Sequence, residues 1–235
     1  TITENPDFFG TKTNTTKVDG NSLTLVSGQV EGTYDFNSVF DLGATYTSYV
    51  ESFIDILQLN YANLFDDPTE SFDLREGLFD GDPAAYDGST AVVQVATTLD
   101  DPTSATATFT PFNTLSAGSF SARGYKFRAV LTTNNLDVAP KVTRLEVKID
   151  MPDVIQSAND IQFTGTKVVA FPAGFYNTST PAVSTSITGL SSGDYVEITS
   201  KTHTGFTITA KDSSGTQLTT QTELDYVARG YGKET

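Results

Sequence analysis

The feature that most constrains the fold of this chain is an apolar period of two residues. In Tyr125–Leu131, apolar and aromatic side chains alternate with basic ones, and similar alternation runs through Thr143–Ile149 and Phe206–Ala210. Successive side chains of a strand point to opposite faces of a sheet, so this period predicts strands with one buried face. Helical periodicity is nearly absent. Only Ser52–Tyr61 could form a short helix, and its alternation fits a strand equally well.

Short segments rich in Gly, Asp, Asn, Ser and Pro separate these runs. They include Val18–Asn21, Asp80–Pro83, Asp100–Pro102, Ser191–Asp194 and Ser213–Gly215. These residue types favour turns, because Gly and Asn accept a positive φ and Asp and Ser side chains bond to nearby backbone. Many short strands with frequent turns are typical of antiparallel β-sandwiches. We therefore predict an all-β fold.

The domain organisation is indicated by a break after Ile149. Met151-Pro152-Asp153 follows a strand-like run, and proline ends ladder pairing. A polar stretch then precedes a further strand at Ile161–Phe163, and most acidic residues lie before this break. We predict two consecutive antiparallel β-sandwiches, residues 1–152 and residues 153–235. Because the chain begins without Met inside a polar stretch, we expect it to be a fragment of a longer polypeptide.

The charge balance excludes several classes of partner. The chain has 29 acidic and 14 basic residues, a formal net charge of −15, and no cysteine. Such a charge repels phosphate backbones and anionic membrane surfaces, so we expect no nucleic-acid partner. The lack of cysteine excludes disulfides and thiol catalysis. No apolar run approaches the roughly 18 residues of a membrane span, so we expect no membrane insertion.

The first part of the chain resembles a known sandwich. The segments that carry the resemblance are Phe40–Ile56 (FDLGATYTSYVESFIDI), Thr97–Phe112 (TTLDDPTSATATFTPF) and Ser119–Asp150, with SFSARGYKFRAVL and PKVTRLEVKIDMPD. They are similar to the galactose-binding-like (discoidin-type) sandwich of central tail-hub and host-specificity proteins of tailed phages. Those domains often carry Trp in the segment that corresponds to Phe109–Phe112, whereas this chain has no Trp.

The second part, Val168–Gly232, also resembles a phage domain. Its segments VVAFPAGFYNTSTPAV, SGDYVEITSKTHTGFTITAKDSSG and LDYVARGYG are similar to the small sandwich that closes such tail proteins, and to H-type lectin domains. The chain as a whole therefore resembles the C-terminal region of a tailed-phage tail-tip protein.

That resemblance implies a jelly-roll or galactose-binding-like sandwich followed by a small lectin-like one. It also implies a structural and attachment module without enzymatic activity, located in the distal tail of the virion and facing the extracellular medium. The expected partners are two further copies in a homotrimer, other tail proteins, and a host cell-surface glycan or receptor. Three alternatives remain: a carbohydrate-binding module of a secreted enzyme or adhesin, a capsule depolymerase, and a pure spacer.

The most unusual segment is acidic and lies in Phe65–Gly88. Calcium takes six to eight oxygen ligands, which clustered carboxylates and turn carbonyls can supply. The candidate calcium ligands are Asp66, Asp67, Asp80, Asp82 and Asp87. Discoidin-type sandwiches often hold a structural calcium, so the resemblance implies the same ion. The alternative is a solvated loop whose Asp and Gly residues form turns. A glycosidase carboxylate pair is disfavoured, because no apolar pocket is evident around any one acid.

Catalysis by the single histidine is also disfavoured. His203 lies between polar neighbours just before a strand, and the chain contains no G-x-S-x-G motif. One histidine also makes a poor zinc site. We therefore expect His203 to occupy an exposed turn.

The closing segment LDYVARGYG supplies candidate ligand-binding residues, Tyr226, Arg229 and Tyr231. Tyr and Arg together suit sugars, because a ring offers a flat face and a guanidinium bonds to hydroxyls or carboxylates. Alternation places Tyr226 on one face and the other two on the opposite face. The alternative is that Tyr226 belongs to the core, with Arg229 and Tyr231 on the sheet surface or at a subunit contact. Arg128 is expected to brace its sheet by pairing with an acid.

Overall fold

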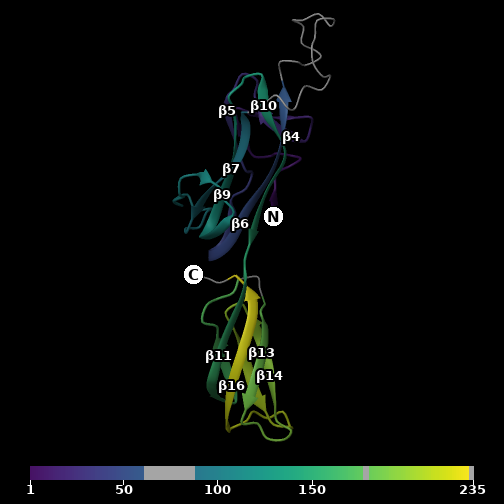
Figure 1. Cartoon of the computed structure of the whole chain (residues 1–235). Coiled ribbons are helices and arrows are strands. Elements are labelled where there is room, and N and C mark those ends of the chain that lie inside the picture. The colour runs from purple at the N-terminus through teal and green to yellow at the C-terminus, as the bar shows by residue number, and fades with distance from the viewer. Residues whose placement is uncertain (61–87, 177–179, 233–235) are drawn as a thin grey trace, which may run out of the picture. The chain divides into compact units, whose positions relative to one another are not determined.

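The computed structural model describes residues 1–60, 88–176 and 180–232, and these residues form an all-β fold of antiparallel sheets (Figure 1). The described residues contain no helix, and so none long and apolar enough to cross a membrane. The predicted fold class is confirmed: the chain is all-β and consists of antiparallel sheets.

The strands are β1 (Ile2–Thr3), β2 (Thr11–Thr13), β3 (Thr15–Val18), β4 (Ser22–Leu25), β5 (Glu31–Asp35), β6 (Phe40–Asn60), β7 (Ser89–Thr98), β8 (Asn113–Thr114), β9 (Gly118–Thr133), β10 (Val138–Asp150), β11 (Asp153–Thr164), β12 (Thr166–Ala170), β13 (Ala182–Thr188), β14 (Tyr195–Thr202), β15 (Gly205–Lys211) and β16 (Gln221–Tyr231).

The chain divides into two compact units, which are described separately. The first unit contains Thr1–Leu42, Val50–Gly118 and Arg123–Ile149. The second contains Asp150–Thr235 together with two short pieces of β6 and β9, Gly43–Tyr49 and Ser119–Ala122.

The first unit is organised around β9. Its sheet has the order β2-β5-β9-β6-β10-β4-β3, with β7 also paired to β9 and β1 to β10. Strand β9 pairs with β7 from Thr98↔Gly124 to Ser89↔Thr133, and with β5 from Asp35↔Arg128 to Glu31↔Thr132. Strands far apart in the sequence are therefore neighbours of β9.

The core of the first unit follows the alternation in the sequence. On β9, Tyr125, Phe127, Ala129 and Leu131 are buried, whereas the residues between them are half-buried on the opposite face. Further core residues are Phe8, Leu23, Leu25, Tyr34, Val93, Val95, Val142, Leu145 and Val147. A turn predicted at Val18–Asn21 joins β3 to β4, with positive φ angles at Asp19 and Gly20. The period of two thus predicted the buried face correctly.

The segment with two possible readings, Ser52–Tyr61, is a strand as far as it is described. Residues Ser52–Asn60 continue β6, which begins at Phe40 and runs for 21 residues. The strand assignment is therefore the correct one of the two, although burial does not alternate along this segment and Leu57 is 57% exposed.

The second unit is a small β-sandwich. One sheet has the order β11-β16-β13 and the other β12-β15-β14. Buried side chains from both sheets form one core, which also includes residues of the segment after β12: Phe163, Val169, Phe171, Phe175, Phe206, Ile208, Ala210, Leu224, Tyr226 and Ala228. Because each sheet buries one face, the outer residues of β11, β13 and β16 can remain polar.

The polar stretch before Ile161 is a strand and not a connection, which corrects the sequence-based expectation. Strand β11 starts at Asp153 and pairs with β16 from Asp153↔Tyr231 to Ala158↔Tyr226, before the register shifts. The buried Gln156 is accommodated because its side-chain amide exchanges two hydrogen bonds with the backbone of Ala173, at 2.8 and 3.1 Å. Satisfied hydrogen bonds let a polar side chain face inward.

Candidate ligand-binding site

The residues suggested by the closing segment are not brought together. Tyr226 lies in the core of the second unit, with its ring centroid 5.4 Å from that of Phe206 and 5.9 Å from that of Phe171. Burial raises the pKa of its phenol. Tyr226 therefore takes part in packing, the position that the alternative interpretation gave it.

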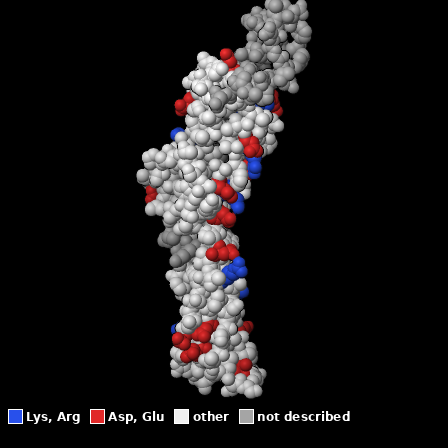
Figure 2. All heavy atoms as spheres, viewed as in Figure 1, with Lys and Arg blue, Asp and Glu red and all other residues white. Residues whose placement is uncertain are grey.

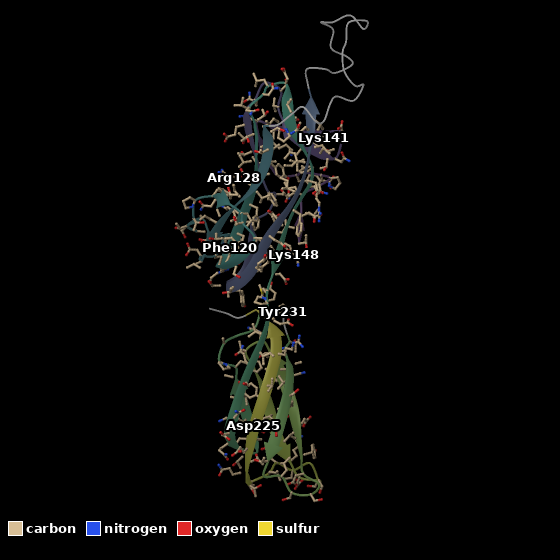
Figure 3. All side chains as sticks on the ribbon, in the orientation of Figure 1. Phe120, Arg128, Lys141, Lys148, Asp225 and Tyr231 are labelled. Carbon is tan, nitrogen blue, oxygen red and sulfur yellow. The ribbon has the colours of Figure 1, made fainter. Side chains whose placement is uncertain are left out.

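Arg229 and Tyr231 lie on the opposite, outer face of β16. Arg229 Nη2 donates to Asp153 Oδ2 at 2.6 Å, and both side chains are about two-thirds exposed. The ring of Tyr231 lies 5.8 Å from that of Tyr176. Figure 3 shows Tyr231 at the end of β16, with Asp225 farther along the same strand. The exposed ion pair contributes little to stability, and neither Arg229 nor Tyr231 lines either of the two hollows of the first unit described below.

The candidate calcium ligands Asp66, Asp67, Asp80, Asp82 and Asp87 lie outside the described residues. Within residues 1–60, 88–176 and 180–232, no three His, Cys, Asp or Glu side chains gather in a group that could hold a metal ion. His203 lies in the predicted turn, between β14 and β15, but it is half-buried and not exposed, and its backbone carbonyl accepts a hydrogen bond from Phe175 N at 2.9 Å.

A stronger candidate site lies on the outer face of β9 in the first unit. Arg128, labelled in Figure 3, was expected to pair with an acid on this sheet. It instead contacts a side-chain amide and an aromatic ring. Its Nε donates to Gln94 Oε1 at 2.7 Å, and its guanidinium carbon lies 4.2 Å from the ring centroid of Phe112. Gln94 is the residue of β7 directly opposite Arg128, so the cross-strand pair fixes the guanidinium beneath the ring.

The ring of Phe112 belongs to a long connection, the Leu99–Phe112 loop, which lies against this face. Three alternate residues of β9 contact it: Gly124 faces Pro102, Lys126 lies under Phe109 at 4.0 Å, and Arg128 lies under Phe112. Alternate residues of a strand share a face, so the loop follows the strand for at least five residues. Cation–π contacts of this kind stabilise each pair by about 0.5–1 kcal/mol at exposed sites.

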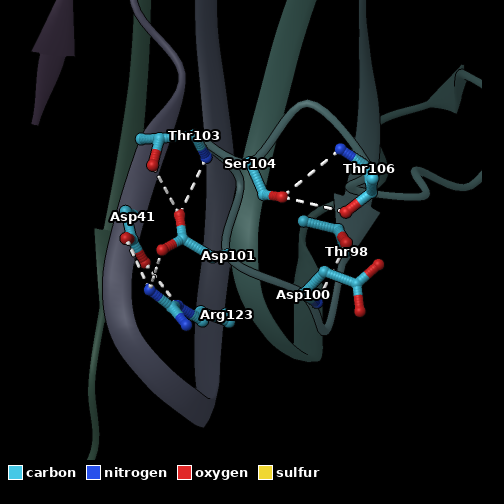
Figure 4. A network of polar contacts seen from close by, with 8 residues as sticks. All are labelled: Asp41, Thr98, Asp100, Asp101, Thr103, Ser104, Thr106 and Arg123. Carbon is cyan, nitrogen blue, oxygen red and sulfur yellow. Dashed lines mark hydrogen bonds and ion pairs between the residues drawn. The ribbon is translucent and has the colours of Figure 1, made fainter.

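An ion-pair network fastens the start of the same loop (Figure 4). Arg123 donates to the two carboxylate oxygens of Asp41 at 3.0 and 3.2 Å, and its Nη2 lies 3.0 Å from Asp101 Oδ2. Asp101 Oδ1 also accepts hydrogen bonds from the backbone and the hydroxyl of Thr103, at 2.9 and 2.7 Å. Those bonds, with the Arg123 charge, lower the pKa of Asp101, and the bond to Asp41 raises the pKa of Arg123.

The fastened loop forms one wall of a hollow of about 310 Å³, which we name the Phe112 hollow. It is lined by Asp35, Phe36, Ser38, Val39, Phe112, Lys126 and Phe127. Arg128 contacts the Phe112 ring but does not line the hollow. Neither the Asp35 carboxylate nor the Lys126 ammonium group has an ion-pair partner among the described residues.

The Phe112 hollow combines an apolar wall with a few polar groups that can fix a small ligand. Its volume is at the low end of ligand sites, which suits one compact molecule. The carboxylate accepts hydrogen bonds, the ammonium group donates them, and the Ser38 hydroxyl does both. This set suits a polyhydroxylated ring with one apolar face. No histidine lines the Phe112 hollow, and the described residues contain no cluster that could bind a metal ion.

Sequence reasoning missed this site because its residues come from three segments that are far apart in the sequence. Asp35 ends β5, Ser38 and Val39 follow it, Phe112 closes the loop, and Lys126 lies on β9. The only local signals were the Phe109–Phe112 pair in a polar loop and the basic residues alternating along β9. Their meeting depends on the pairing of β5 and β7 with the two sides of β9, which the sequence pattern does not specify.

The surface charge does not favour the binding of an anionic partner. On the face drawn in Figure 2, basic atoms lie next to acidic ones and form no broad basic patch. Several ion pairs account for this, among them Lys141 with Asp19 and Lys148 with Glu51.

Comparison with protein-family models, with curated proteins and with solved structures gave no match. Functional inference therefore rests on the geometry of the site and on the resemblance described above.

Proposed function

We propose that this chain is a non-enzymatic attachment module that holds a glycan in the Phe112 hollow and belongs to the tip of a phage tail. The observation that carries the glycan assignment is that Phe112, Asp35 and Lys126 line one hollow, where Asp35 and Lys126 have no ion-pair partner in the described part of the chain and the Lys126 ammonium group lies over the Phe109 ring. Aromatic rings offer sugars a flat apolar face, and charged groups bond to their hydroxyls.

The rigidity of the site supports a binding role. The Phe112 ring is held from β9 by Arg128, which is itself held by Gln94, and the Leu99–Phe112 loop is fastened by Arg123. A wall fixed before the ligand arrives loses little conformational entropy on binding, which favours affinity.

The tail-tip assignment is supported by the order of the resembling segments in the two units, a larger sandwich-like unit followed by a small one. In that setting the module would sit in the distal tail with other tail proteins, and the glycan would belong to the host surface. The rival assignment, a carbohydrate-binding module of a secreted enzyme or adhesin, uses the same hollow but works as a monomer.

The glycan assignment is tested by calorimetric titration of the whole chain with D-galactose, D-glucose, D-mannose and N-acetyl-D-glucosamine. We expect at least one of them to bind in the millimolar range, as is usual for a single shallow site. Phe112→Ala and Asp35→Asn should each weaken that binding, whereas Val168→Ala, a change at an exposed residue of the second unit, should not.

Absence of binding by all four sugars would contradict the assignment, as would equal binding by wild type and both hollow variants. Release of smaller sugars from a bound oligosaccharide would contradict the non-enzymatic part.

A further inference from the structure

A second hollow borders the first and has a different chemistry. It is lined by Ile2, Thr3, Glu4, Asn5, Asp7, Phe9, Asn37 and Ser38, and its volume is about 250 Å³. We name it the Phe9 hollow. Ser38 lines both hollows, and Asn37 and Val39 on either side of it line one each. The short segment after β5 therefore forms a shared wall.

A buried carboxylate lies at the Phe9 hollow. Glu4 is only 8% exposed, and its Oε2 accepts a hydrogen bond from the hydroxyl of Tyr34 and lies 3.5 Å from Asn37 N. Its Oε1 accepts no hydrogen bond from the described part of the chain. The Tyr34 hydroxyl in turn accepts from Gly10 N at 2.8 Å. One oxygen of Glu4 is thus held by the protein, and the other remains able to accept a hydrogen bond.

Phe9 presents an aromatic ring at the rim of the same hollow. It is 75% exposed, whereas its neighbour Phe8 is fully buried. The Phe8 ring packs edge-to-face with the Tyr34 ring, with 5.6 Å between the ring centroids. Two hydrogen bonds attach the segment before Phe9 to β10: Glu4 N donates to Leu145 O at 3.0 Å, and Leu145 N donates to Asn5 Oδ1 at 2.9 Å. An exposed ring on a fixed segment can contact a ligand at a low cost in conformational entropy.

The combined charge of the two hollows is negative. Glu4 and Asp7 line the Phe9 hollow and Asp35 lines the Phe112 hollow, whereas Lys126 is the one basic side chain that lines either. The Phe9 hollow has two acids and no basic lining residue. Lys17 Nζ lies 4.0 Å from Asp7 Oδ1 and offsets part of this charge, but the buried Glu4 carboxylate has no ion-pair partner in the described part of the chain and disfavours a carboxylated, sulfated or phosphorylated sugar.

We propose that the two hollows form one extended site for a neutral oligosaccharide, in which the Phe9 hollow binds the sugar next to the one in the Phe112 hollow. This inference rests on the proposed glycan binding and adds a second subsite and a ligand class. Phe9 supplies the apolar contact, and Glu4, Asn5 and Asn37 supply hydrogen bonds to hydroxyls.

The test is a calorimetric titration of the whole chain with mono-, di- and trisaccharides of galactose, glucose and N-acetylglucosamine, and with lactose against sialyllactose. We expect the longer neutral chains to bind more tightly than the monosaccharide, and sialyllactose to bind more weakly than lactose. Phe9→Ala should cost about tenfold in affinity for the trisaccharide, the scale of one good aromatic contact, and leave monosaccharide binding unchanged. Leu136→Ala, at an exposed apolar residue that lines neither hollow, is the matched control.

The outcomes separate this inference from the function on which it rests. Monosaccharide binding that is sensitive to Phe112→Ala, with no gain from chain length and no effect of Phe9→Ala, overturns the second subsite and leaves the first. Sialyllactose binding as tight as lactose overturns the neutral ligand class. Failure of every sugar to bind overturns both proposals.

Discussion

Arg123 lies 3.0 Å from Asp101, from Nη2 to Oδ2, and this ion pair connects strand β9 to the loop that carries Phe109 and Phe112. Arg123 also bonds to both carboxylate oxygens of Asp41 on β6. The same guanidinium therefore joins β6, β9 and the loop. We therefore expect the position of Phe112, at the other end of the loop, to depend in part on this contact.

Replacing Arg123 by Gln should loosen that loop. Removal of the guanidinium leaves Asp101 and Asp41 close together without the positive charge between them, so the loop should open more often. Hydrogen exchange should become faster at Thr110 N, which donates to Thr97 O at 2.9 Å, and at Thr108 N, which donates to Asp100 Oδ2. Arg144→Gln, at an arginine that pairs with Glu146 elsewhere on the sheet, is the control. Unchanged exchange in Arg123→Gln would show that the cation–π contacts hold the loop alone.

The contacts of Asp101 that hold the Leu99–Phe112 loop should weaken at acid pH. Hydrogen bonds from Thr103 and the charge of Arg123 lower the pKa of Asp101, so the folded state binds its proton less tightly than the unfolded chain. The contribution of Asp101 is therefore fully present above its ordinary pKa of about 3.9 and is lost as pH falls through the lowered value. The NMR shift of the Thr103 amide should report this transition. Asp101→Asn should remove the transition, and its persistence in that variant would assign it to another acid.

Close packing of Pro102 on β9 gives a steric test. A Cβ at Gly124 would lie 2.6 Å from Pro102 Cβ and 2.8 Å from Thr98 Cγ2, so Gly124→Ala must displace the loop. We expect a loss of about 1–3 kcal/mol in unfolding free energy and weaker sugar binding. Gly118→Ala, on the same strand, meets only Ser116 O at 3.8 Å and should stay within about 0.5 kcal/mol of wild type. Equal stability of the two variants would mean that the loop moves at no cost.

The buried hydroxyl of Tyr34 gives a test of the Phe9 hollow. Tyr34→Phe leaves the Glu4 carboxylate and Gly10 N without their partner, and we expect a loss of about 1–3 kcal/mol in urea unfolding followed by near-ultraviolet circular dichroism. Tyr49→Phe, at a tyrosine that is 45% exposed, should have little effect. If both changes are neutral, the Glu4–Tyr34 bond does not organise the segment that presents Phe9.

Burial, with the bond to Glu4, also raises the pKa of Tyr34. Its neutral form is therefore favoured in the folded state, and its contribution to stability is full below the ordinary value of about 10 and falls as pH rises above it. Wild type should lose more stability than Tyr34→Phe between neutral and strongly alkaline pH.

The sequence predicted the strands and their buried faces where alternation was clear. On β9 and β15, the apolar positions Tyr125, Phe127, Phe206 and Ile208 are all buried. The sequence did not predict the first part of β11, because the polar Gln156 faces inward there and its side-chain amide bonds to the backbone of Ala173. No sequence pattern indicates that Ala173 is its partner. Both hollows were missed for a similar reason. Ser38 lines one hollow with Lys126 and the other with Glu4, and tertiary pairing brings these distant residues to their hollows.

The tail-tip assignment and the calcium expectation can be tested together by light scattering coupled to size exclusion, with and without a calcium chelator. The resemblance predicts a trimer mass. If Asp66, Asp67, Asp80, Asp82 and Asp87 hold calcium, chelation should lower the thermal stability or dissociate the trimer. A monomer that does not respond to the chelator would favour the secreted binding module and would identify the aspartates as solvated turn residues.

Glycan binding in the Phe112 hollow is best tested by a ¹H–¹⁵N NMR titration of the whole chain with the neutral monosaccharides named above. We expect amide shifts to concentrate at Asp35–Val39, Phe112 and Lys126, and Phe112→Ala to abolish them. Shifts concentrated instead at Arg229 and Tyr231, or no shifts at any sugar concentration, would contradict glycan binding in the Phe112 hollow.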